Sequence, residues 1–568
     1  MDNKQITKTL KLTIQLMELH EENSFKIRSY QSAVNTLDRE APDLFHKSSN
    51  ELQSINGIGK SIAEVILEII ARGSHKLLDE LLEKTPEGIL EVLTIKGLGP
   101  KKIKTLWQEL QITSTHELME ACRSGQVAKL KGFGEKTQES IIASLEYIDS
   151  NKGKWLYADI EEAVDGLMVS LTNLFGKGKA VVVGQYSRKL EIISLLEILI
   201  ESKDNRKALN QLGKLEGLNQ QISLSSPYRW GGILEKFGLR CDILLVRPEK
   251  FVNEMLLRKA SRAHLSAPLT DGNILGELFL SRSFQTEEDA YREAGMCWVP
   301  EELREGLYEL EWAKEGKIPK LLELGDLKGP LHNHSTYSDG KHSLREMADF
   351  CISQGYEYLG MADHSKSAFY ANGLDEDRVA QQQKEIDSLN ASLAPFKLFK
   401  GIESDILIDG SLDYSNKVLE SFDYVVASVH SSLGMDRNKA TARLLKAIQN
   451  PFTTILGHPT GRLLLRRQGY PIDHKAIIDA CAIHGVVIEI NANPWRLDLD
   501  WRWVNYAISQ GVKLSINPDA HETAGFADMK YGVMMGRKGG LTPDMTLNTL
   551  RVNELDSFFQ NRKKQKRV

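Results

Sequence analysis

Seven short apolar runs alternate with helix-compatible segments from residue 328 onward. Each run has the β-type composition of a buried strand and ends in polar residues, and the segments between the runs are long enough for helices. Strands that alternate with helices in this way are typical of a parallel βα barrel. The runs occupy residues 329–335, 358–365, 396–404, 424–431, 453–460, 486–493 and 512–521.

The first 150 residues have a different pattern, with apolar residues at helical spacing in several short segments. Between these segments one element repeats three times: an apolar helix end, the tripeptide Gly-x-Gly and the start of a new helix. We expect helices at 25–37, 61–73, 101–110 and 137–148. The glycine pairs are Gly57 and Gly59, Gly97 and Gly99, and Gly132 and Gly134.

The middle of the chain mixes the two patterns. Apolar β-like runs at 179–184 and 240–248 alternate with a helix-like run at 194–202, which predicts a mixed α/β domain. A charged helical stretch with Pro and Gly near its ends, residues 300–329, indicates a connector. The predicted division is a helical domain at 1–150, a mixed α/β domain at 151–300, a linker at 301–327 and a barrel at 328–568.

The composition fits a soluble globular protein of several domains, because 41% of the 568 residues are hydrophobic and 26% are charged. The N-terminus lacks the apolar core of a signal peptide, and no run of eighteen apolar residues occurs, so we expect a cytoplasmic protein without membrane contact.

Five widely spaced cysteines without a Cys-x-x-Cys pair argue against disulfides and against a thiolate zinc site. The net charge of −5 gives no overall attraction for nucleic acid.

Histidine is concentrated in the predicted barrel, which contains nine of the fourteen histidines. Six of the nine lie at the ends of the apolar runs, with three carboxylates at or just beyond them. Because the carboxyl ends of barrel strands form one rim, these side chains converge on one cavity. Burying them without a counter-charge costs on the order of several kcal/mol each, and metal coordination offsets that cost. The candidate ligands are His332, His334, Asp339, His364, Glu403, His430, His458, Asp519 and His521.

Nine candidate ligands are more than one transition-metal ion binds, since such an ion takes about four to six ligands with water included. We therefore predict two or three divalent ions; the imidazole-rich donor set favours Mn or Zn and is compatible with Fe. Hydroxide bound to such a cluster attacks a phosphoester, and the ions hold the phosphoester oxygens. Lys366, Arg462 and Arg496, near the same rim, are candidates for binding the phosphate.

The motifs HNHSTYSDG, ADHS, GIESDIL, SVHS, GHPTGR and DAH, in this order, resemble the PHP (polymerase and histidinol phosphatase) domain over about residues 328–568. Every position where that family places a ligand carries a ligating residue in this sequence. The resemblance implies a distorted (β/α)7 barrel, a trinuclear Mn or Zn site, and phosphoesterase or nuclease chemistry.

The three N-terminal repeats resemble helix-hairpin-helix motifs, whose Gly-x-Gly turns bring backbone N–H groups and a helix N-terminus to a nucleic-acid phosphate. Together with FKIRSYQSA (25–33) and the PHP motifs, they make the whole chain resemble the bacterial family-X DNA polymerase/3′–5′ exonuclease. The resemblance implies gapped, nicked or 3′-ended DNA as partner, an 8-kDa-like and fingers region at 1–150, and a nucleotidyltransferase-like palm and thumb at 151–300. No obligate protein partner is inferred. The predicted DNA contacts are the six glycines of the repeats with Lys60, Lys101, Lys102 and Lys136.

The sequence departs from that family at the palm. The family signature is a Gly-Ser followed about ten residues later by an Asp-x-Asp pair that holds two Mg ions. Here Gln185 replaces the serine, Leu195 and Glu197 stand where the aspartates belong, and only the third carboxylate, Asp242, remains. Leucine cannot bind a metal, so we predict that nucleotidyl transfer is absent or nearly so. In the first repeat, Val65 occupies the position of the family's Schiff-base lysine.

These patterns favour a metal-dependent DNA-repair phosphodiesterase, acting as a 3′–5′ exonuclease or as a nuclease for abasic sites or 3′ ends, with polymerase activity lost. Three alternatives remain open at this point. The first is an active family-X polymerase with a PHP exonuclease, and the second is a small-molecule phosphatase of the histidinol-phosphate kind. The third is a DNA-binding scaffold with a structural metal site, although structural zinc uses four ligands.

Overall fold

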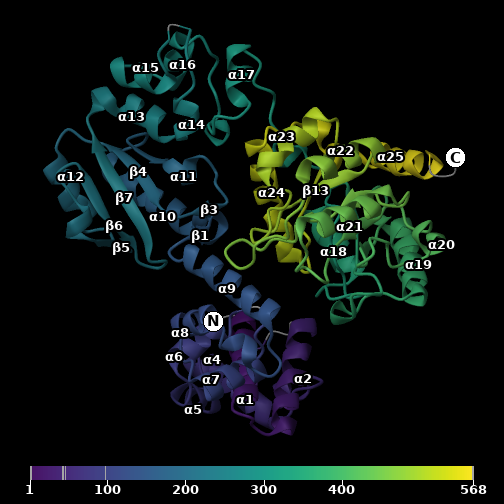
Figure 1. Cartoon of the computed structure of the whole chain (residues 1–568). Helices are drawn as coiled ribbons and strands as arrows, with labels where there is room; N and C mark the ends of the chain where they lie inside the picture. The colour runs from purple at the N-terminus through teal and green to yellow at the C-terminus, as the bar shows by residue number, and fades with distance from the viewer. Residues whose placement is uncertain (1–2, 41–43, 45–46, 96, 271, 566–568) are drawn as a thin grey trace. The chain divides into compact units, whose positions relative to one another are not determined.

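The computed structural model describes residues 3–40, 44, 47–95, 97–270 and 272–565. The chain divides into two compact units, Met1–Lys152 and Gly153–Val568, and each is described by itself (Figure 1). No helix in these described ranges is long and apolar enough to cross a membrane.

The first unit is helical around one apolar core, and its three Gly-x-Gly turns share one geometry. In each turn the first glycine has a φ between +84° and +88°, where only glycine is unstrained, and the second glycine is the N-cap of the following helix. The turns precede α4, α7 and α9. The elements of the unit are α1 (Asn3–Leu19), α2 (Ser24–Glu40), α3 (Ser49–Gln53), α4 (Lys60–Arg72), α5 (Lys76–Glu83), α6 (Glu87–Val92), α7 (Pro100–Leu110), α8 (Thr115–Arg123), η1 (Val127–Lys129) and α9 (Glu135–Ser150).

The second unit begins with a mixed α/β part built on a five-stranded sheet of order β2-β4-β7-β6-β5. Strands β4 and β7 are parallel and the other pairs are antiparallel. The strands are β2 (Ala180–Val183), β4 (Leu196–Glu201), β5 (Leu218–Gln220), β6 (Arg229–Leu234) and β7 (Leu239–Val246), and a separate pair joins β1 (Trp155–Leu156) to β3 (Ile192–Ile193). The helical elements are α10 (Tyr157–Phe175), α11 (Gly184–Ser187), α12 (Asn205–Leu212) and the turn η2 (Ile222–Leu224).

The run at 194–202 was predicted as a helix, and this prediction is wrong because the run contains strand β4. The strand lies between β2 and β7, and its residues Ile198, Leu199 and Ile200 are fully buried. A central strand is apolar on both faces, so its continuous apolar run has no alternation that distinguishes it from a buried helix.

A helical subdomain with its own apolar core follows the sheet. Its buried polar centre is His264, whose Nδ1 lies 2.7 Å from Glu309 and whose Nε2 lies 2.9 Å from the Tyr291 hydroxyl. Arg304 and Glu309 are fully buried, so part of the segment predicted as a linker packs into this core. The elements are η3 (Pro248–Lys250), α13 (Phe251–Arg258), α14 (Arg262–Leu265), α15 (Leu275–Ser281), α16 (Glu287–Glu293), η4 (Glu301–Leu303), α17 (Glu309–Lys314) and η5 (Leu324–Asp326).

The remaining strands form the predicted barrel. Five parallel strands pair in sequence order, from β10 (Glu403–Asp405) through β11 (Val426–Ser428), β12 (Ile455–Leu456) and β13 (Val487–Asn491) to β14 (Leu514–Asn517). Strand β8 (Tyr358–Met361) pairs in parallel with β9 (Lys397–Lys400). Parallel bridges join His364 to Glu403 and Asn333 to Ala520, and the backbone N–H of Gly360 donates to Pro330 at 2.9 Å. These connections place all seven predicted runs in order around one ring.

Helices and short turns connect the strands of the barrel. They are α18 (Leu344–Ser353), η6 (Phe369–Ala371), α19 (Glu376–Leu393), α20 (Asn416–Leu419), α21 (Arg437–Gln449), α22 (His474–His484), α23 (Trp501–Ser509), η7 (Thr523–Asp528), α24 (Met529–Lys538), η8 (Pro543–Met545), η9 (Leu547–Thr549) and α25 (Val552–Gln565).

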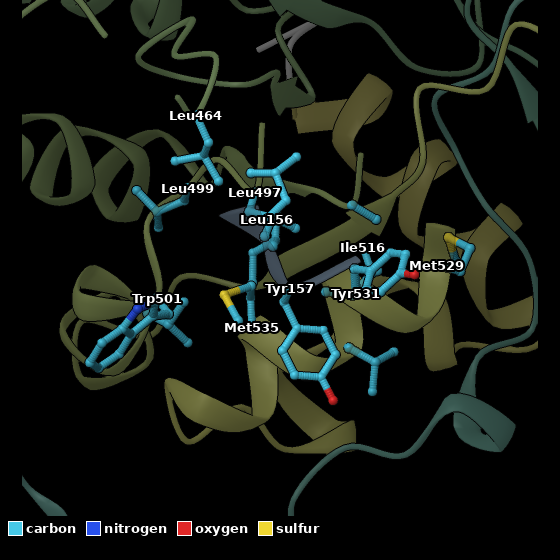
Figure 2. Packing of buried hydrophobic residues seen from close by; sticks show 14 of the residues in the cluster. Leu156, Tyr157, Leu464, Leu497, Leu499, Trp501, Ile516, Met529, Tyr531 and Met535 are labelled. Atoms are coloured by element: carbon cyan, nitrogen blue, oxygen red, sulfur yellow. The ribbon is translucent and has the colours of Figure 1, made fainter. Parts of the chain in front are cut away.

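The α/β part and the barrel share one apolar cluster within the second unit. Figure 2 shows Leu156 and Tyr157, at the start of the α/β part, among barrel residues that include Leu497 and Met535. Beside this cluster the buried ammonium group of Lys538 donates to Glu305 at 2.7 Å. A buried lysine is stable only when its charge is paired, so this contact fixes the barrel against the helical subdomain, and a second bond from the same ammonium group to the Arg188 carbonyl at 2.8 Å joins the barrel to the α/β part.

Candidate metal centre

The barrel brings the predicted ligands together in three overlapping groups, in each of which the potential ligand atoms lie within 4.8 Å of one another. Most of these side chains follow the carboxyl end of a strand, so the ring of strands delivers them to one rim. The groups are His334, Asp339, His364 and His521; His332, His334 and Asp519; and His364, Glu403 and His430.

Glu403 lies at the centre of the cluster and is 1% exposed. Its Oε1 lies 3.1 Å from the Nε2 atoms of both His430 and His458 and 3.3 Å from Nε2 of His332. Its Oε2 lies 2.9 Å from Nδ1 of His364. One carboxylate that faces four imidazoles through both oxygens has the arrangement of a bridging ligand.

Asp519 and Asp339 extend the cluster on either side of His334. The Oδ1 of Asp519 lies 3.0 Å from Nε2 of His334, and the Oδ1 of Asp339 lies 3.3 Å from Nε2 of His521. All nine predicted ligands therefore lie in one connected cluster, with His458 joined to it through Glu403.

Several buried ligand atoms of this cluster have no hydrogen-bond partner among the described residues. They are Nε2 of His332, both ring nitrogens of His334, Nδ1 of His364, Nδ1 of His458 and Oε2 of Glu403. A buried polar atom without a partner costs about 1–3 kcal/mol, so several such atoms aimed at one another need a counterpart. Nitrogen and carboxylate lone pairs are the donors that Mn, Zn and Fe take, and the residues present therefore fit divalent metal ions.

The protonation preferences of the histidines agree with this fit. Burial, together with His521 and His364, lowers the pKa of His334 to about 3, which leaves its ring neutral and able to donate a lone pair. Burial opposes the charged form of His430, but Glu403 and Asp405 outweigh it and raise the pKa of His430 to about 10. A divalent cation would take the place of the proton that these carboxylates attract.

Two carboxylates that orient the histidines were missed by the sequence analysis. Asp405 accepts from Nδ1 of His430 at 2.5 Å, and Glu489 accepts from Nδ1 of His332 at 2.7 Å. Such contacts fix the ring orientation and leave Nε2 facing the cluster. A signal for Asp405 existed, because it lies two residues after Glu403 in strand β10 and alternate residues of a strand share one face.

The three predicted phosphate-binding residues differ in their surroundings. Arg496 lies beside the cluster, with its Nε 3.5 Å from Oδ2 of Asp519. Lys366 is partly exposed and pairs with Glu376 at 2.7 Å. Arg462 is 13% exposed, and its guanidinium contacts Asp500 at 2.5 Å and the backbone carbonyls of Arg496 and Leu497. Arg462 therefore holds the loop that carries Arg496.

In the first unit, grooves lie at two of the three Gly-x-Gly turns. One groove, of about 790 Å³, is lined by residues that include Gly57, Gly59 and Lys60. The other, of about 600 Å³, is lined by residues that include Gly97, Gly99, Lys101 and Lys102. Arg28 lines both grooves. At the third turn, formed by Gly132 and Gly134, Lys136 is exposed.

The two palm carboxylates are register partners on the adjacent strands β4 and β7. Glu197 pairs with Arg258 at 3.5 Å, while Asp242 lies 3.2 Å from Arg240 and 3.7 Å from Arg229. Within the described residues, neither carboxylate belongs to a cluster of three or more potential metal ligands. Both charges are instead balanced by arginines.

Gln185 has a structural role at the position of the family's serine. Its side-chain oxygen accepts from the backbone N–H groups of Ser194 at 2.8 Å and Leu195 at 3.3 Å. The glutamine therefore holds the segment that leads into β4.

Family models match three parts of the chain. A helix-hairpin-helix domain matches residues 1–75, a SAM-like helix-hairpin-helix tandem matches residues 89–146, and the PHP domain matches residues 330–493. The predictions of helix-hairpin-helix and PHP modules are confirmed.

Curated relatives cover either the whole chain or the barrel alone. The DNA polymerase/3′–5′ exonuclease PolX of Bacillus subtilis (strain 168) is 34% identical over 575 residues, which cover 99% of this chain and 100% of that protein. A probable phosphatase of Thermoanaerobacter sp. (strain X514) is 26% identical over 246 residues, 41% of this chain and 94% of its own length. A probable phosphatase of Syntrophotalea carbinolica is 23% identical over 244 residues, 41% of this chain and 95% of its own length.

Proposed function

The chain belongs to the family of bacterial DNA polymerase/3′–5′ exonuclease PolX, and we propose that its barrel hydrolyses phosphodiester bonds at DNA 3′ ends or at abasic sites. The barrel is a metal-dependent phosphoesterase domain. The observation that carries the proposal is the connected cluster of nine predicted ligands that includes Glu403, with several buried ligand atoms that make no hydrogen bond within the described protein.

Two or three Mn or Zn ions, with Fe also compatible, fit the number and type of ligands. When bound, such ions activate water at neutral pH and stabilise the charge that develops on a phosphoester. The nine predicted ligands would hold the ions, and Glu403 would contribute both of its carboxylate oxygens. Asp405 and Glu489 hold His430 and His332 in the ring orientation that presents Nε2 to the cluster.

Arg496 is the residue placed best to bind the substrate phosphate. It lies at the edge of the cluster, it is partly exposed, and a guanidinium binds phosphate oxygens through two parallel N–H groups. Lys366 is a second candidate at the same rim, where release of its contact with Glu376 would free the ammonium group.

DNA is the proposed partner of the first unit, in gapped, nicked or 3′-ended form. The helix-hairpin-helix models and the grooves at the turns support this assignment, since the turns present backbone N–H groups at helix N-termini. We assign residues 1–150 to DNA binding, residues 151–300 to a palm and thumb, and residues 328–568 to catalysis.

We further propose that the palm has lost nucleotidyl transfer. The family's reaction requires two Mg ions on three oriented carboxylates, whereas this chain has Leu195 at one of the positions. The remaining Glu197 and Asp242 pair with arginines, and these cations would have to move before a metal ion could bind.

The reaction is tested with single-stranded DNA labelled at the 5′ end or at the 3′ end, incubated with the purified chain and Mn. Stepwise shortening of the 5′-labelled strand, with immediate release of a mononucleotide from the 3′-labelled strand, supports 3′–5′ exonuclease action. A single internal cut at an abasic site supports the endonuclease form. Hydrolysis of a small phosphate monoester without cleavage of either strand would instead support the phosphatase function named for the barrel-only relatives.

A further inference from the structure

Two successive aromatic residues are exposed on the turn η6 (Phe369–Ala371), and the second of them lies against the metal centre. Phe369 is 88% exposed and Tyr370 is 71% exposed. Leaving a large aromatic ring in water forfeits the free energy of its burial, so two in succession at a catalytic rim indicate a binding surface.

Tyr370 lies close to the cluster itself. Its ring centroid is 6.2 Å from that of His364, with the ring planes at 62°. The ring of Tyr370 therefore lies against a predicted metal ligand while most of its surface remains exposed.

The turn that carries these rings is firmly anchored. Its Ala368 N–H donates to the Ser365 carbonyl at 3.0 Å, and Asp413 accepts from the Ser365 hydroxyl at 2.7 Å and from the Ser367 N–H at 3.0 Å. A Cβ on Gly373 would lie 1.9 Å from the Ser365 carbonyl oxygen, so the chain approaches itself here as closely as glycine allows. An anchored turn presents its aromatic rings without a large loss of entropy on binding.

We propose that Phe369 and Tyr370 form a platform on which the base of the 3′-terminal nucleotide of single-stranded DNA stacks during hydrolysis of its phosphodiester bond. This inference rests on the proposed nuclease function and adds a determinant of its substrate. A nucleobase has a π-face that stacks on an aromatic side chain whatever its sequence, which suits an enzyme that removes nucleotides one after another.

The position of the platform favours a nucleobase over other occupants. The base of a terminal nucleotide is one sugar away from its phosphodiester bond, and the platform is similarly adjacent to the predicted catalytic rim. A small phosphate monoester without a ring would use Arg496 and the metal ions and would leave both aromatic side chains in water.

The test compares two 5′-labelled single strands that differ only at the 3′-terminal residue. One ends in a normal nucleoside and the other in a tetrahydrofuran residue, which keeps the phosphates and lacks the base. We expect the wild type to remove the normal terminal nucleotide with a kcat/KM at least about tenfold higher than that for the tetrahydrofuran residue, since stacking on one ring contributes about that factor. Phe369→Ala and Tyr370→Ala should each lose about tenfold on the nucleoside end and remain unchanged on the tetrahydrofuran end.

Two control variants accompany this comparison. Tyr370→Phe keeps the ring and should keep the preference for a base, and Ile483→Ala removes an equally exposed apolar side chain from α22 and should change neither rate. The proposed platform would be contradicted if the wild type cleaved both ends with the same kcat/KM. It would also be contradicted if the alanine variants lost the same factor in kcat/KM on both ends.

A binding measurement separates failure of the platform from failure of the proposed function. A strand with a phosphorothioate linkage and 2-aminopurine at its 3′ end reports stacking as fluorescence quenching, without turnover. If the wild type cleaves neither end, the nuclease function is contradicted. Even then, fluorescence quenching that occurs with the wild type and is lost in the Phe369→Ala/Tyr370→Ala double variant would support the platform. Absence of quenching in the wild type would contradict it.

Discussion

The Nδ1 atom of His332 lies 2.7 Å from Oε2 of Glu489, and both side chains are fully buried. The same carboxylate accepts from the backbone N–H of His458 and from the side chain of Asn491, each at 3.1 Å. Glu489 therefore positions two predicted metal ligands at once, although it does not face the metal cluster itself. The geometry of the centre depends on strand β13 as much as on the ligands.

Replacing Glu489 by Gln should weaken metal binding by about 10- to 100-fold, the usual cost of losing a carboxylate that orients a ligand. The amide would also turn one acceptor oxygen into a donor that faces the donors of His458 and Asn491. Manganese titration followed by calorimetry measures the effect. Glu420→Gln, an exposed change at the end of α20, serves as the control, and equal affinity in the two variants would contradict the positioning role.

The affinity for DNA should depend on exposed lysines at the hairpin turns. Lys60, Lys101 and Lys136 are exposed, and each lies one or two residues after the second glycine of a turn. Each change to Ala should weaken binding of all sequences alike and reduce the slope of log Kd against log salt concentration by about one. Fluorescence anisotropy at several salt concentrations checks this.

The matched control for the hairpin lysines is Lys76→Ala, which removes an exposed lysine of the same unit from α5, away from the Gly-x-Gly turns. If this change lowers the salt slope as much as the hairpin changes do, binding reflects overall charge and the hairpins have no special role.

The ends of the apolar runs were enough to predict which side chains cluster at the barrel rim, because a strand end in a parallel barrel has a defined place in space. Glu489 was missed because it lies in the middle of strand β13, where a carboxylate is not expected until its histidine partner is known. Asp405 was missed although it ends strand β10, two residues after Glu403. The strand at 194–202 was mistaken for a helix, because a central strand buried on both faces loses its alternation. The roles of the nine individual ligands and of the phosphate-binding residues stay predictions.

The palm should not extend a primer. With a primer–template, all four dNTPs and Mg or Mn, we expect no product longer than the primer, since Leu195 supplies no ligand and arginines neutralise Glu197 and Asp242. The assay should use the Glu403→Gln variant, so that nuclease action does not remove new nucleotides. Extension by even a few nucleotides would contradict the loss of polymerase activity.

The helical subdomain after the sheet should lose stability in mild acid. Burial lowers the pKa of His264, whose Nε2 accepts from Tyr291, a contact that requires the neutral ring. The unfolded chain therefore binds a proton at this histidine more readily than the folded chain does. The stability that the neutral His264 ring contributes is complete above about pH 6.5 and decreases as the pH drops toward the pKa of the folded state. Charges near the ring come from Glu309, Arg304 and Glu305.

Hydrogen exchange of residues 251–321 between pH 5 and pH 8 measures the contribution of His264. After division by the intrinsic exchange rate at each pH, the protection of the wild type should decrease as the pH falls, and His264→Gln should reduce this dependence. His484→Gln, an exposed change at the end of α22, should leave it intact. An identical pH dependence in the wild type and His264→Gln would show that His264 is not the titrating group.

The most direct test of the central claim is the rate at which a 5′-labelled single strand is shortened by the wild type and by Glu403→Gln, with bound Mn measured in the same samples. Glu403 contacts four imidazoles of the cluster, so its loss should remove at least one ion per chain and lower the rate by at least about a hundredfold. Glu420→Gln should match the wild type in both measurements. Undiminished shortening by Glu403→Gln, with its metal lost, would contradict the assignment of nuclease activity to the barrel.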